Sequence, residues 1–188
     1  MVPAGGPIPS DLARRVRLVI FDVDGVLTDA GVYVGRLPGG GEVEMKRFDI
    51  QDGLGLKLLQ RAGLEVVIVS GRTSSATEAR AAELGIECHQ DSGAHKLPAV
   101  RQVMGRLGVG WDQVAMLADD IPDVAVLRNA GLKAAVANAV PQVAAMADWR
   151  TTREGGRGAA REFCDALLAA RGELERVVEA YVAERSAP

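Results

Sequence analysis

The chain has little of several features that define whole classes of proteins. It contains two cysteines, Cys88 and Cys164, which cannot form a disulfide framework. No apolar run approaches the ~20 residues needed to cross a bilayer. Basic residues are not in excess, because 22 lysines and arginines face 25 aspartates and glutamates, for a net charge of −3. Domains that bind nucleic acid are usually strongly basic, so the composition argues against a general nucleic-acid surface.

The first ten residues contain proline and glycine but not the apolar core of a signal peptide. We therefore expect a cytoplasmic protein in which both thiols stay reduced. The two histidines, His89 and His95, lack a partner pattern that would indicate zinc. Apolar residues make up 48% of the 188 residues, enough to bury a sizeable core. This predicts a single domain over residues 1–188, with about the first 12 residues and the last few frayed.

Four short runs are nearly continuously apolar, which is typical of parallel strands covered on both faces. These runs are residues 18–21, 66–69, 114–117 and 134–137. Helical patterns lie between them. One predicted helix, over residues 73–84, begins with a capping box of Ser75 and Glu78 and ends at Gly85. Because strands and helices alternate, we predict the α/β class, with a mostly parallel, Rossmann-like sheet flanked by helices.

Two segments depart from this alternation. Residues 31–48 contain two β-type runs around the glycines at 39–41, which predicts a small β-hairpin inserted after the first strand. This hairpin and one helix use the chain between the first two core strands, so we expect no large cap domain. Residues 155–158, Gly-Gly-Arg-Gly, predict a flexible loop before a C-terminal helix that ends near residue 185 and breaks at Gly172.

Acidic side chains follow two of the predicted strands, at the point where each strand ends. Asp22 and Asp24 come directly after the first run. Asp119, Asp120 and Asp123 follow the third. A turn explains Asp-x-Asp-Gly about as well as chemistry does, but helix capping explains only one of the three later aspartates. In open α/β sheets ligands bind beyond the carboxyl ends of strands, and hard oxygen ligands from two strand ends predict a Mg²⁺ site.

Two further features have a structural and a functional interpretation. Ser70 and Gly71 follow the second strand and precede a helix, where they form either a helix N-cap or an anion site. Lys96 lies near the start of another helix, where lysine is slightly unfavourable for the helix dipole, and a plain surface lysine is the alternative. Arg72 either pairs with a carboxylate or contacts a substrate.

In this order along the chain, the features resemble the haloacid dehalogenase superfamily of aspartate-nucleophile phosphatases. The resemblance runs from about residue 18 to residue 172. It is to the small, capless branch typified by 3-deoxy-manno-octulosonate 8-phosphate phosphatase. The motifs that carry it are Asp-Val-Asp-Gly-Val-Leu-Thr-Asp at 22–29, Asp-Gly-Leu-Gly-Leu-Lys at 52–57, Ser-Gly-Arg at 70–72, Lys96, the aspartates at 119, 120 and 123, and Gly-Gly-Arg-Gly-Ala at 155–159.

The resemblance implies a role for each candidate residue. Asp22 would be the nucleophile that attacks phosphorus, and Asp24 the general acid and base. The groups implied to hold the phosphoryl oxygens are Ser70, Gly71 and Lys96. Those implied to hold Mg²⁺ are the carboxylates of Asp22 and Asp119 and the backbone carbonyl of Asp24. Further candidates beside the metal or the substrate are Asp120, Asp123, Arg72 and Arg157.

The implied reaction is hydrolysis of the phosphate of an eight- or nine-carbon 2-keto-3-deoxy sugar acid, in the synthesis of a surface glycan. The expected substrate is 3-deoxy-manno-octulosonate 8-phosphate, and a nonulosonate 9-phosphate is the alternative. A homotetramer in which the inserted hairpins associate is also implied. We expect neither nucleic acid nor a membrane as a partner. The alternative from a different functional class is a catalytically weak phosphatase-like interaction domain. A receiver domain shares the acidic pocket and lysine but has them in a different order and spacing.

Three positions depart from the usual motifs of this family. Ala118 replaces the glycine before the metal-binding aspartate. Gln51 replaces an arginine, and Asn138 replaces the aspartate of Asp-Ala-His-Pro. The changes at Gln51 and Asn138 bear on the choice of sugar more than on the reaction.

Overall fold

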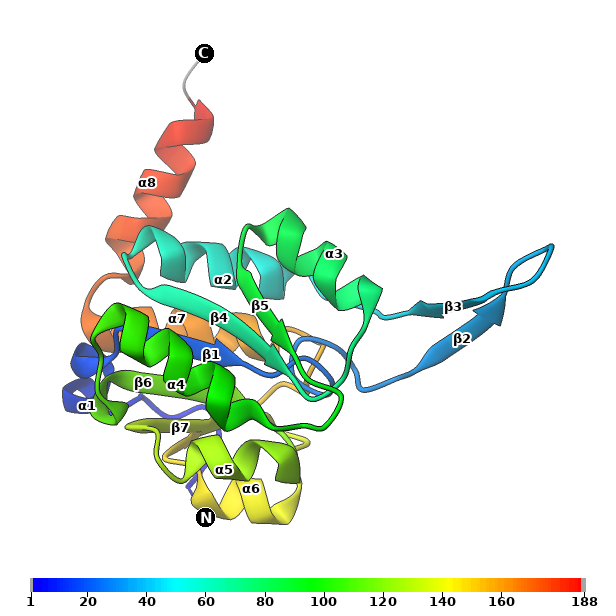
Figure 1. Cartoon of the computed structure of the whole chain (residues 1–188). Coiled ribbons are helices and arrows are strands. Elements are labelled where there is room, and N and C mark those ends of the chain that lie inside the picture. The colour runs from blue at the N-terminus through cyan, green and yellow to red at the C-terminus, as the bar shows by residue number, and fades with distance from the viewer. Residues whose placement is uncertain (1, 187–188) are drawn as a thin grey trace.

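The computed structural model describes residues 2–186. Within them a six-stranded sheet runs through the middle of the molecule, in the order β5-β4-β1-β6-β7-β8 (Figure 1). All adjacent strands pair in parallel. The predicted α/β class is therefore confirmed. The strands are β1 Leu18–Phe21, β4 Glu65–Ser70, β5 Glu87–Gln90, β6 Val114–Ala118, β7 Leu132–Ala135 and β8 Trp149–Arg150.

Helices cover both faces of the sheet. Those on one face are α1 Ser10–Arg15, α2 Ile50–Arg61, α3 Ser75–Leu84 and α7 Ala159–Arg171. Those on the other are α4 Lys96–Leu107, α5 Val124–Leu127 and α6 Pro141–Met146. In β1, Val19 and Phe21 pack against the first layer, whereas Leu18 and Ile20 pack against the second. Successive side chains of a strand point to opposite faces, so burial on both faces makes the run continuously apolar.

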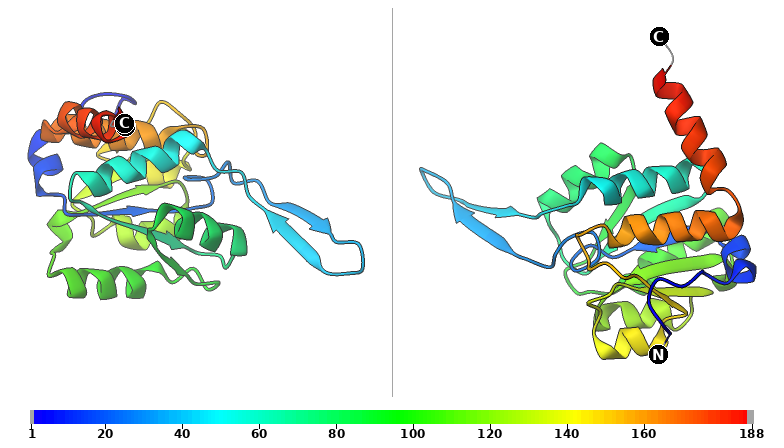
Figure 2. Two further views of the ribbon diagram at one scale, coloured as in Figure 1. Left: turned by 90° about the horizontal axis from the view of Figure 1, so that it is seen from above. Right: turned by 180° about the vertical axis from the view of Figure 1, so that it is seen from behind.

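Two elements project from this body. β2 Tyr33–Arg36 and β3 Glu42–Met45 form the antiparallel hairpin, which extends outward beyond the carboxyl edge of the sheet (Figures 1 and 2). α8, Leu174–Ser186, follows α7 and points away from the sheet (Figure 2). The inserted hairpin is thus confirmed, and between β1 and β4 the chain holds only this hairpin and α2, so no cap domain lies there. Among the described residues, no helix combines the length and the apolar character needed to cross a membrane.

Several strand predictions need correction. β7 begins at Leu132, two residues before the predicted run at 134–137. The apolar pattern misses this start because the half-buried Lys133 interrupts it. The Lys133 ammonium lies 3.7 Å from Asp148 Oδ2, and this ion pair accommodates a charged residue within the strand. β5 reads Glu-Cys-His-Gln and lies at the sheet edge, where half-buried positions tolerate polar side chains, so its composition hides it.

The structure agrees with some of the predictions for helix ends and for the N-terminus and contradicts others. The capping box of α3 is wrong, because Ser74, not Ser75, occupies the N-cap position. Gly85 and Gly172 end their helices in the left-handed conformation, with φ of 57° and 75°, as the sequence indicates. The predicted fraying is wrong for Gly5 and Gly6, which are held by hydrogen bonds, and for residues 10–12, which lie in α1, whereas residues 1 and 187–188 lie outside the described residues. The Gly5 N–H donates to the Arg150 carbonyl at 2.9 Å, and the Trp149 indole donates to the Gly6 carbonyl at 2.5 Å.

The glycine loop before α7 packs directly on the turn that follows β1. A Cβ atom at Gly155 would lie 1.7 Å from the Gly25 carbonyl oxygen. The Gly156 N–H donates to the Val26 carbonyl at 2.9 Å, and the Arg47 side chain donates to the Gly156 carbonyl at 2.5 Å. The loop that the sequence predicts as flexible is therefore held in place, and its glycines allow two backbones to touch.

Gly155→Ala should lower the free energy of unfolding by about 1–3 kcal/mol, because the added methyl forces the two backbones apart. Gly105→Ala is the matched control. Gly105 lies exposed within α4 with no atom near its added Cβ, so alanine there should raise stability by roughly 0.5–1 kcal/mol. Urea unfolding of both variants measures these changes. Unchanged stability in Gly155→Ala would contradict the close packing.

Candidate active site

Four charged side chains meet at the carboxyl edge of the sheet. Asp22 follows β1, Asp119 and Asp123 follow β6, and Lys96 begins α4. Carboxylate oxygens of the three aspartates lie within 4.8 Å of one another. The Lys96 ammonium contacts the Asp22 carboxylate and lies 2.5 Å from Asp123 Oδ1. Asp123 and Lys96 are 0% and 4% exposed, so this charge cluster extends into the protein interior.

The strand register explains how the aspartates come together. β1 and β6 are adjacent and parallel, with Phe21 beside Leu117. The next residues therefore leave the sheet side by side, which places Asp22 next to the loop that begins at Asp119. Gly25 allows the turn after β1 to approach Asp119 closely, because a Cβ atom at this position would lie 2.0 Å from Asp119 Oδ2. The sequence prediction that the two acidic clusters share one edge agrees with this geometry.

The placement of Lys96 depends on an unusual backbone conformation nearby. Ala94 has a φ of 58°, in the left-handed region that residues with a Cβ adopt at a cost of about 1–3 kcal/mol. Its side chain packs against Gly71, where an added Cβ would lie 3.1 Å from the Ala94 Cβ. This tight turn brings the start of α4 against the end of β4. The strain is thus located where the chain delivers a lysine to the carboxylates.

The cluster perturbs the proton affinities of its own members. Burial, followed by the charges of Asp22 and Asp123, raises the pKa of Asp119 to about 9. Burial and Asp22 also raise the pKa of Asp123 to about 7, against the opposing effect of Lys96. Burial lowers the pKa of Lys96, but the two aspartates it contacts outweigh burial and raise it overall. Three carboxyl groups and one ammonium would carry an excess of negative charge if all of them ionised, and the raised pKa values of Asp119 and Asp123 express that cost.

The same cluster has the chemistry of a divalent-cation site. Asp119 Oδ1 is buried and has no hydrogen-bond partner among the described residues. Carboxylate oxygens gathered around such a space are the ligands that Mg²⁺ prefers. The residues present therefore fit a hard divalent cation, which would also offset the repulsion between the carboxylates.

Asp24 lies apart from the three clustered carboxylates. The Lys46 ammonium approaches it to 2.8 Å from Oδ1 and 3.0 Å from Oδ2. Arg72 Nη1 lies 3.9 Å from Asp24 Oδ2 and pairs more closely with Glu44, at 2.9 Å. Sequence reasoning missed Lys46, because a single lysine after a hairpin strand carries no motif. The separation of Asp24 from the cluster leaves its carboxylate available for a role other than metal binding.

The remaining predicted residues occupy different surroundings. A pocket of about 170 Å³ lies over the cluster, lined by Asp22, Asp24, Gly71, Arg72, Ala94, Lys96, Asp120, Pro122 and Asp123. Ser70 is buried, and its hydroxyl accepts from the Arg72 N–H at 3.1 Å, which forms a local turn. Asp120 is exposed and accepts from the Ile121 N–H at 2.7 Å. The Arg157 side chain is 59% exposed, lies 4.0 Å from Glu154 and does not line the pocket.

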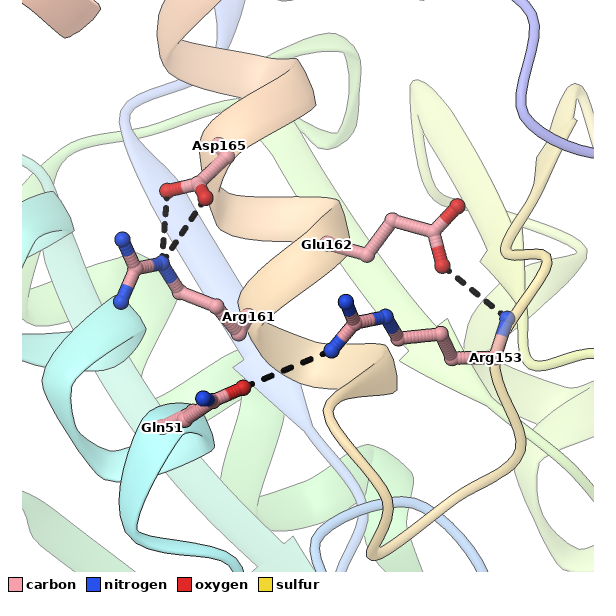
Figure 3. A pocket seen from close by; sticks show the side chains of 5 residues that line it. All are labelled: Gln51, Arg153, Arg161, Glu162 and Asp165. Atoms are coloured by element: carbon pink, nitrogen blue, oxygen red, sulfur yellow. Dashed lines mark hydrogen bonds and ion pairs between the residues drawn. The ribbon is translucent and has the colours of Figure 1, made fainter.

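The positions that depart from the family motifs have defined contacts. Asn138 Oδ1 accepts from the Gly155 N–H at 2.9 Å, so it holds the glycine loop. Gln51 Oε1 accepts from Arg153 at 3.4 Å. Figure 3 shows this pair in a second pocket between the starts of α2 and α7. None of the clustered aspartates lines it; its lining residues are Gln51, Arg153, Arg161, Glu162 and Asp165. Ala118 is fully buried at the end of β6.

Comparison with known proteins identifies the family. The model of the haloacid dehalogenase-like hydrolase family matches residues 90–162. The 3-deoxy-D-manno-octulosonate 8-phosphate phosphatase KdsC of Escherichia coli K12 is 40% identical over 173 residues, which cover 90% of each chain. The chain belongs to the haloacid dehalogenase-like hydrolases. This hydrolase is a phosphatase, and the predicted resemblance to this branch of the superfamily is confirmed.

Solved structures of this hydrolase family agree with the fold and bear on the metal. The 3-deoxy-D-manno-octulosonate 8-phosphate phosphatase of Moraxella catarrhalis, in complex with magnesium ion, phosphate ion and KDO, is 35% identical. It gives a TM-score of 0.82 over 92% of this chain and 97% of that one. The cobalt-bound phosphatase of Haemophilus influenzae is 35% identical, with a TM-score of 0.78 over 87% and 93% of the chains. These two relatives therefore hold magnesium and cobalt, respectively.

Thermal unfolding at pH 8 should show a divalent cation at the cluster. The folded pKa of Asp119, about 9, lies above its ordinary value of 3.8, so stability without metal should fall as the pH rises through this window. Mg²⁺ at about 100 times its Kd should then raise Tm by roughly 5–10 °C.

The control for this measurement is Asp119→Asn, which removes an ionisable group and one metal ligand. It should be more stable than the wild type in a chelator at pH 8 and should lose the Mg²⁺-dependent rise in Tm. An equal rise in both proteins would place the cation elsewhere.

Proposed function

We propose that this phosphatase is Mg²⁺-dependent and hydrolyses the phosphate of a 2-keto-3-deoxy sugar acid, with 3-deoxy-manno-octulosonate 8-phosphate as its substrate. The observation that carries the reaction is the meeting of Asp22, Asp119, Asp123 and Lys96 at one sheet edge. The named activities of the relatives support the choice of substrate.

Asp22 is the proposed nucleophile. Its carboxylate lines the pocket over the cluster and contacts Lys96. One Asp22 oxygen bonds to phosphorus while the bond from phosphorus to the sugar oxygen breaks, which leaves an aspartyl-phosphate. Ser70, Gly71 and Lys96 are the proposed phosphoryl-binding groups, and Lys96 supplies positive charge against the developing negative charge. Asp123 holds Lys96 in place through its 2.5 Å contact.

Asp24 is the proposed general acid and base. It gives a proton to the departing sugar oxygen and so becomes a carboxylate. It then takes a proton from the water that attacks phosphorus, which releases inorganic phosphate and restores Asp22. Mg²⁺, held by Asp22, Asp119 and the Asp24 backbone carbonyl, would reduce the repulsion between the nucleophile and the phosphoryl group.

The exposed hairpin supports a proposed homotetramer. In a single chain its apolar side chains have little to pack against, since Val34 is 66% and Met45 is 57% exposed. Apolar groups gathered on a projecting element are typical of an interface between subunits. Association of hairpins would bring neighbouring subunits close to the open pocket. Arg157, exposed on its loop, is the proposed contact for a substrate carboxylate in such an assembly.

Asp22→Asn should reduce phosphate release by roughly three orders of magnitude or more, because the amide cannot act as an anionic nucleophile. The measurement is kcat/KM over a panel of sugar phosphates and p-nitrophenyl phosphate, with Mg²⁺ and with a chelator. The wild type should favour 3-deoxy-manno-octulosonate 8-phosphate and lose activity in the chelator. A higher kcat/KM for a nonulosonate 9-phosphate would overturn the substrate, and near-normal activity of folded Asp22→Asn would overturn the mechanism.

Light scattering should give the mass of a tetramer for the wild type. Val34→Glu should shift the population towards smaller species, because a charge replaces apolar contact area at the proposed interface. Val182→Glu is the control, since Val182 is similarly exposed, at 54%, but lies on α8. A fully active wild-type monomer would contradict the assembly.

A further inference from the structure

The contact between Lys46 and Asp24 joins a buried ammonium to a half-buried carboxylate, and the sequence motifs do not include it. The Lys46 side chain has no exposed surface. Its ammonium lies 2.8 Å and 3.0 Å from the two Asp24 oxygens. It also donates to the Thr77 hydroxyl at 3.3 Å, so a residue of α3 holds it as well. Removing an ammonium from water is unfavourable unless its partners compensate, so the contacts with Asp24 and Thr77 are what make the burial of Lys46 tolerable.

The backbone around this pair is secured by other contacts. Phe48, two residues after Lys46, forms an isolated antiparallel bridge with Thr28 in the turn that carries Asp24. Arg47 is held separately by the Gly156 carbonyl. These contacts fix the base of the hairpin to the turn without any help from the Lys46 side chain. The Lys46 charge is therefore not needed to hold this part of the backbone, and it can act on the Asp24 carboxylate.

The other charges near Asp24 are arranged differently. Arg72 is 3.9 Å away and is drawn towards Glu44, which accepts from it at 2.9 Å. Glu44 Oε1 lies 4.0 Å from the Lys46 ammonium, too far for a hydrogen bond. Lys46 is thus the cation in direct contact with the Asp24 carboxylate, and Arg72 is a more distant one.

We propose that Lys46 is a positioning residue for the proton transfer carried out by Asp24, an inference that rests on the proposed function. It orients the Asp24 carboxyl group towards the departing oxygen. It also stabilises the carboxylate that remains after the proton has moved to that oxygen. The benefit should depend on how much the leaving group needs the proton. A sugar alkoxide needs it, whereas p-nitrophenolate leaves readily without it.

The test compares Lys46→Met with the wild type on two substrates. On 3-deoxy-manno-octulosonate 8-phosphate, kcat should fall about 10–100-fold, as is typical when an orienting partner is lost, with little change in KM. On p-nitrophenyl phosphate, kcat should fall less than about threefold. Lys46→Arg, which keeps the charge, should recover part of the loss. Lys133→Met is the matched control, since it breaks another lysine–aspartate pair, 3.7 Å from Asp148, and should leave both rates unchanged.

A double variant makes the assignment sharper. If Lys46 acts through Asp24, then Lys46→Met should cost nothing further in an Asp24→Asn background, because the group that it positions is gone. Additive losses would overturn the proposal. Equal losses of kcat on both substrates would indicate a structural role, and a raised KM with unchanged kcat would indicate substrate binding; either result also overturns it.

Folding is checked by circular dichroism and by Tm. If Lys46→Met does not fold, Thr77→Val replaces it, because it removes the hydroxyl that holds the ammonium while keeping the side-chain volume. Thr77→Val must then lower kcat more on the sugar phosphate than on p-nitrophenyl phosphate. If kcat does not show this difference between the two substrates, the role of Lys46 is rejected. If the wild type hydrolyses neither substrate, the proposed function itself fails. An active wild type with an unaffected Lys46→Met rejects only the inference.

Discussion

Negative charge gathered at one end of the sheet is the constraint on which the rest of this structure depends. Carboxylate oxygens of Asp22, Asp119 and Asp123 converge within 4.8 Å, where burial and mutual repulsion raise the pKa values of Asp119 and Asp123. The fold tolerates this because each aspartate leaves a rigid strand end or the turn that follows it, and because Lys96 is buried among them. The left-handed Ala94, two residues before Lys96, shows that the backbone also bears strain to deliver that lysine.

Close backbone packing supports the acidic turns from behind. The loop at 155–158 touches the turn after β1 and, through Asn138, the loop after β7. Asp52 in α2 anchors the end of this loop by accepting from the N–H groups of Gly158 and Arg161, at 3.3 Å and 2.8 Å. Burial raises the pKa of Asp52 to about 6, which these N–H donors partly oppose. The helices α2 and α7 therefore act together as a support for the turn that carries Asp22 and Asp24.

The projecting hairpin connects two levels of organisation. Its strands display apolar side chains to solvent, whereas Lys46, directly after β3, contacts Asp24. Any displacement of the hairpin base would change the surroundings of Asp24, because the bridge from Phe48 to Thr28 joins the two segments.

The sequence by itself determined the α/β class, the central strands β1, β4 and β6, the inserted hairpin and the shared edge of Asp22 and Asp119. Each of these follows from a local pattern, either a continuous apolar run or a carboxylate at the end of one. It did not reveal β5, whose half-buried edge position removes the apolar signal.

Nor did the sequence reveal the pairing of Lys46 with Asp24, of Asp52 with α7 or of Asp123 with Lys96. Tertiary structure alone decided these contacts, because each joins side chains from separate elements. Packing of whole segments, rather than any residue pattern, sets the distance between such groups.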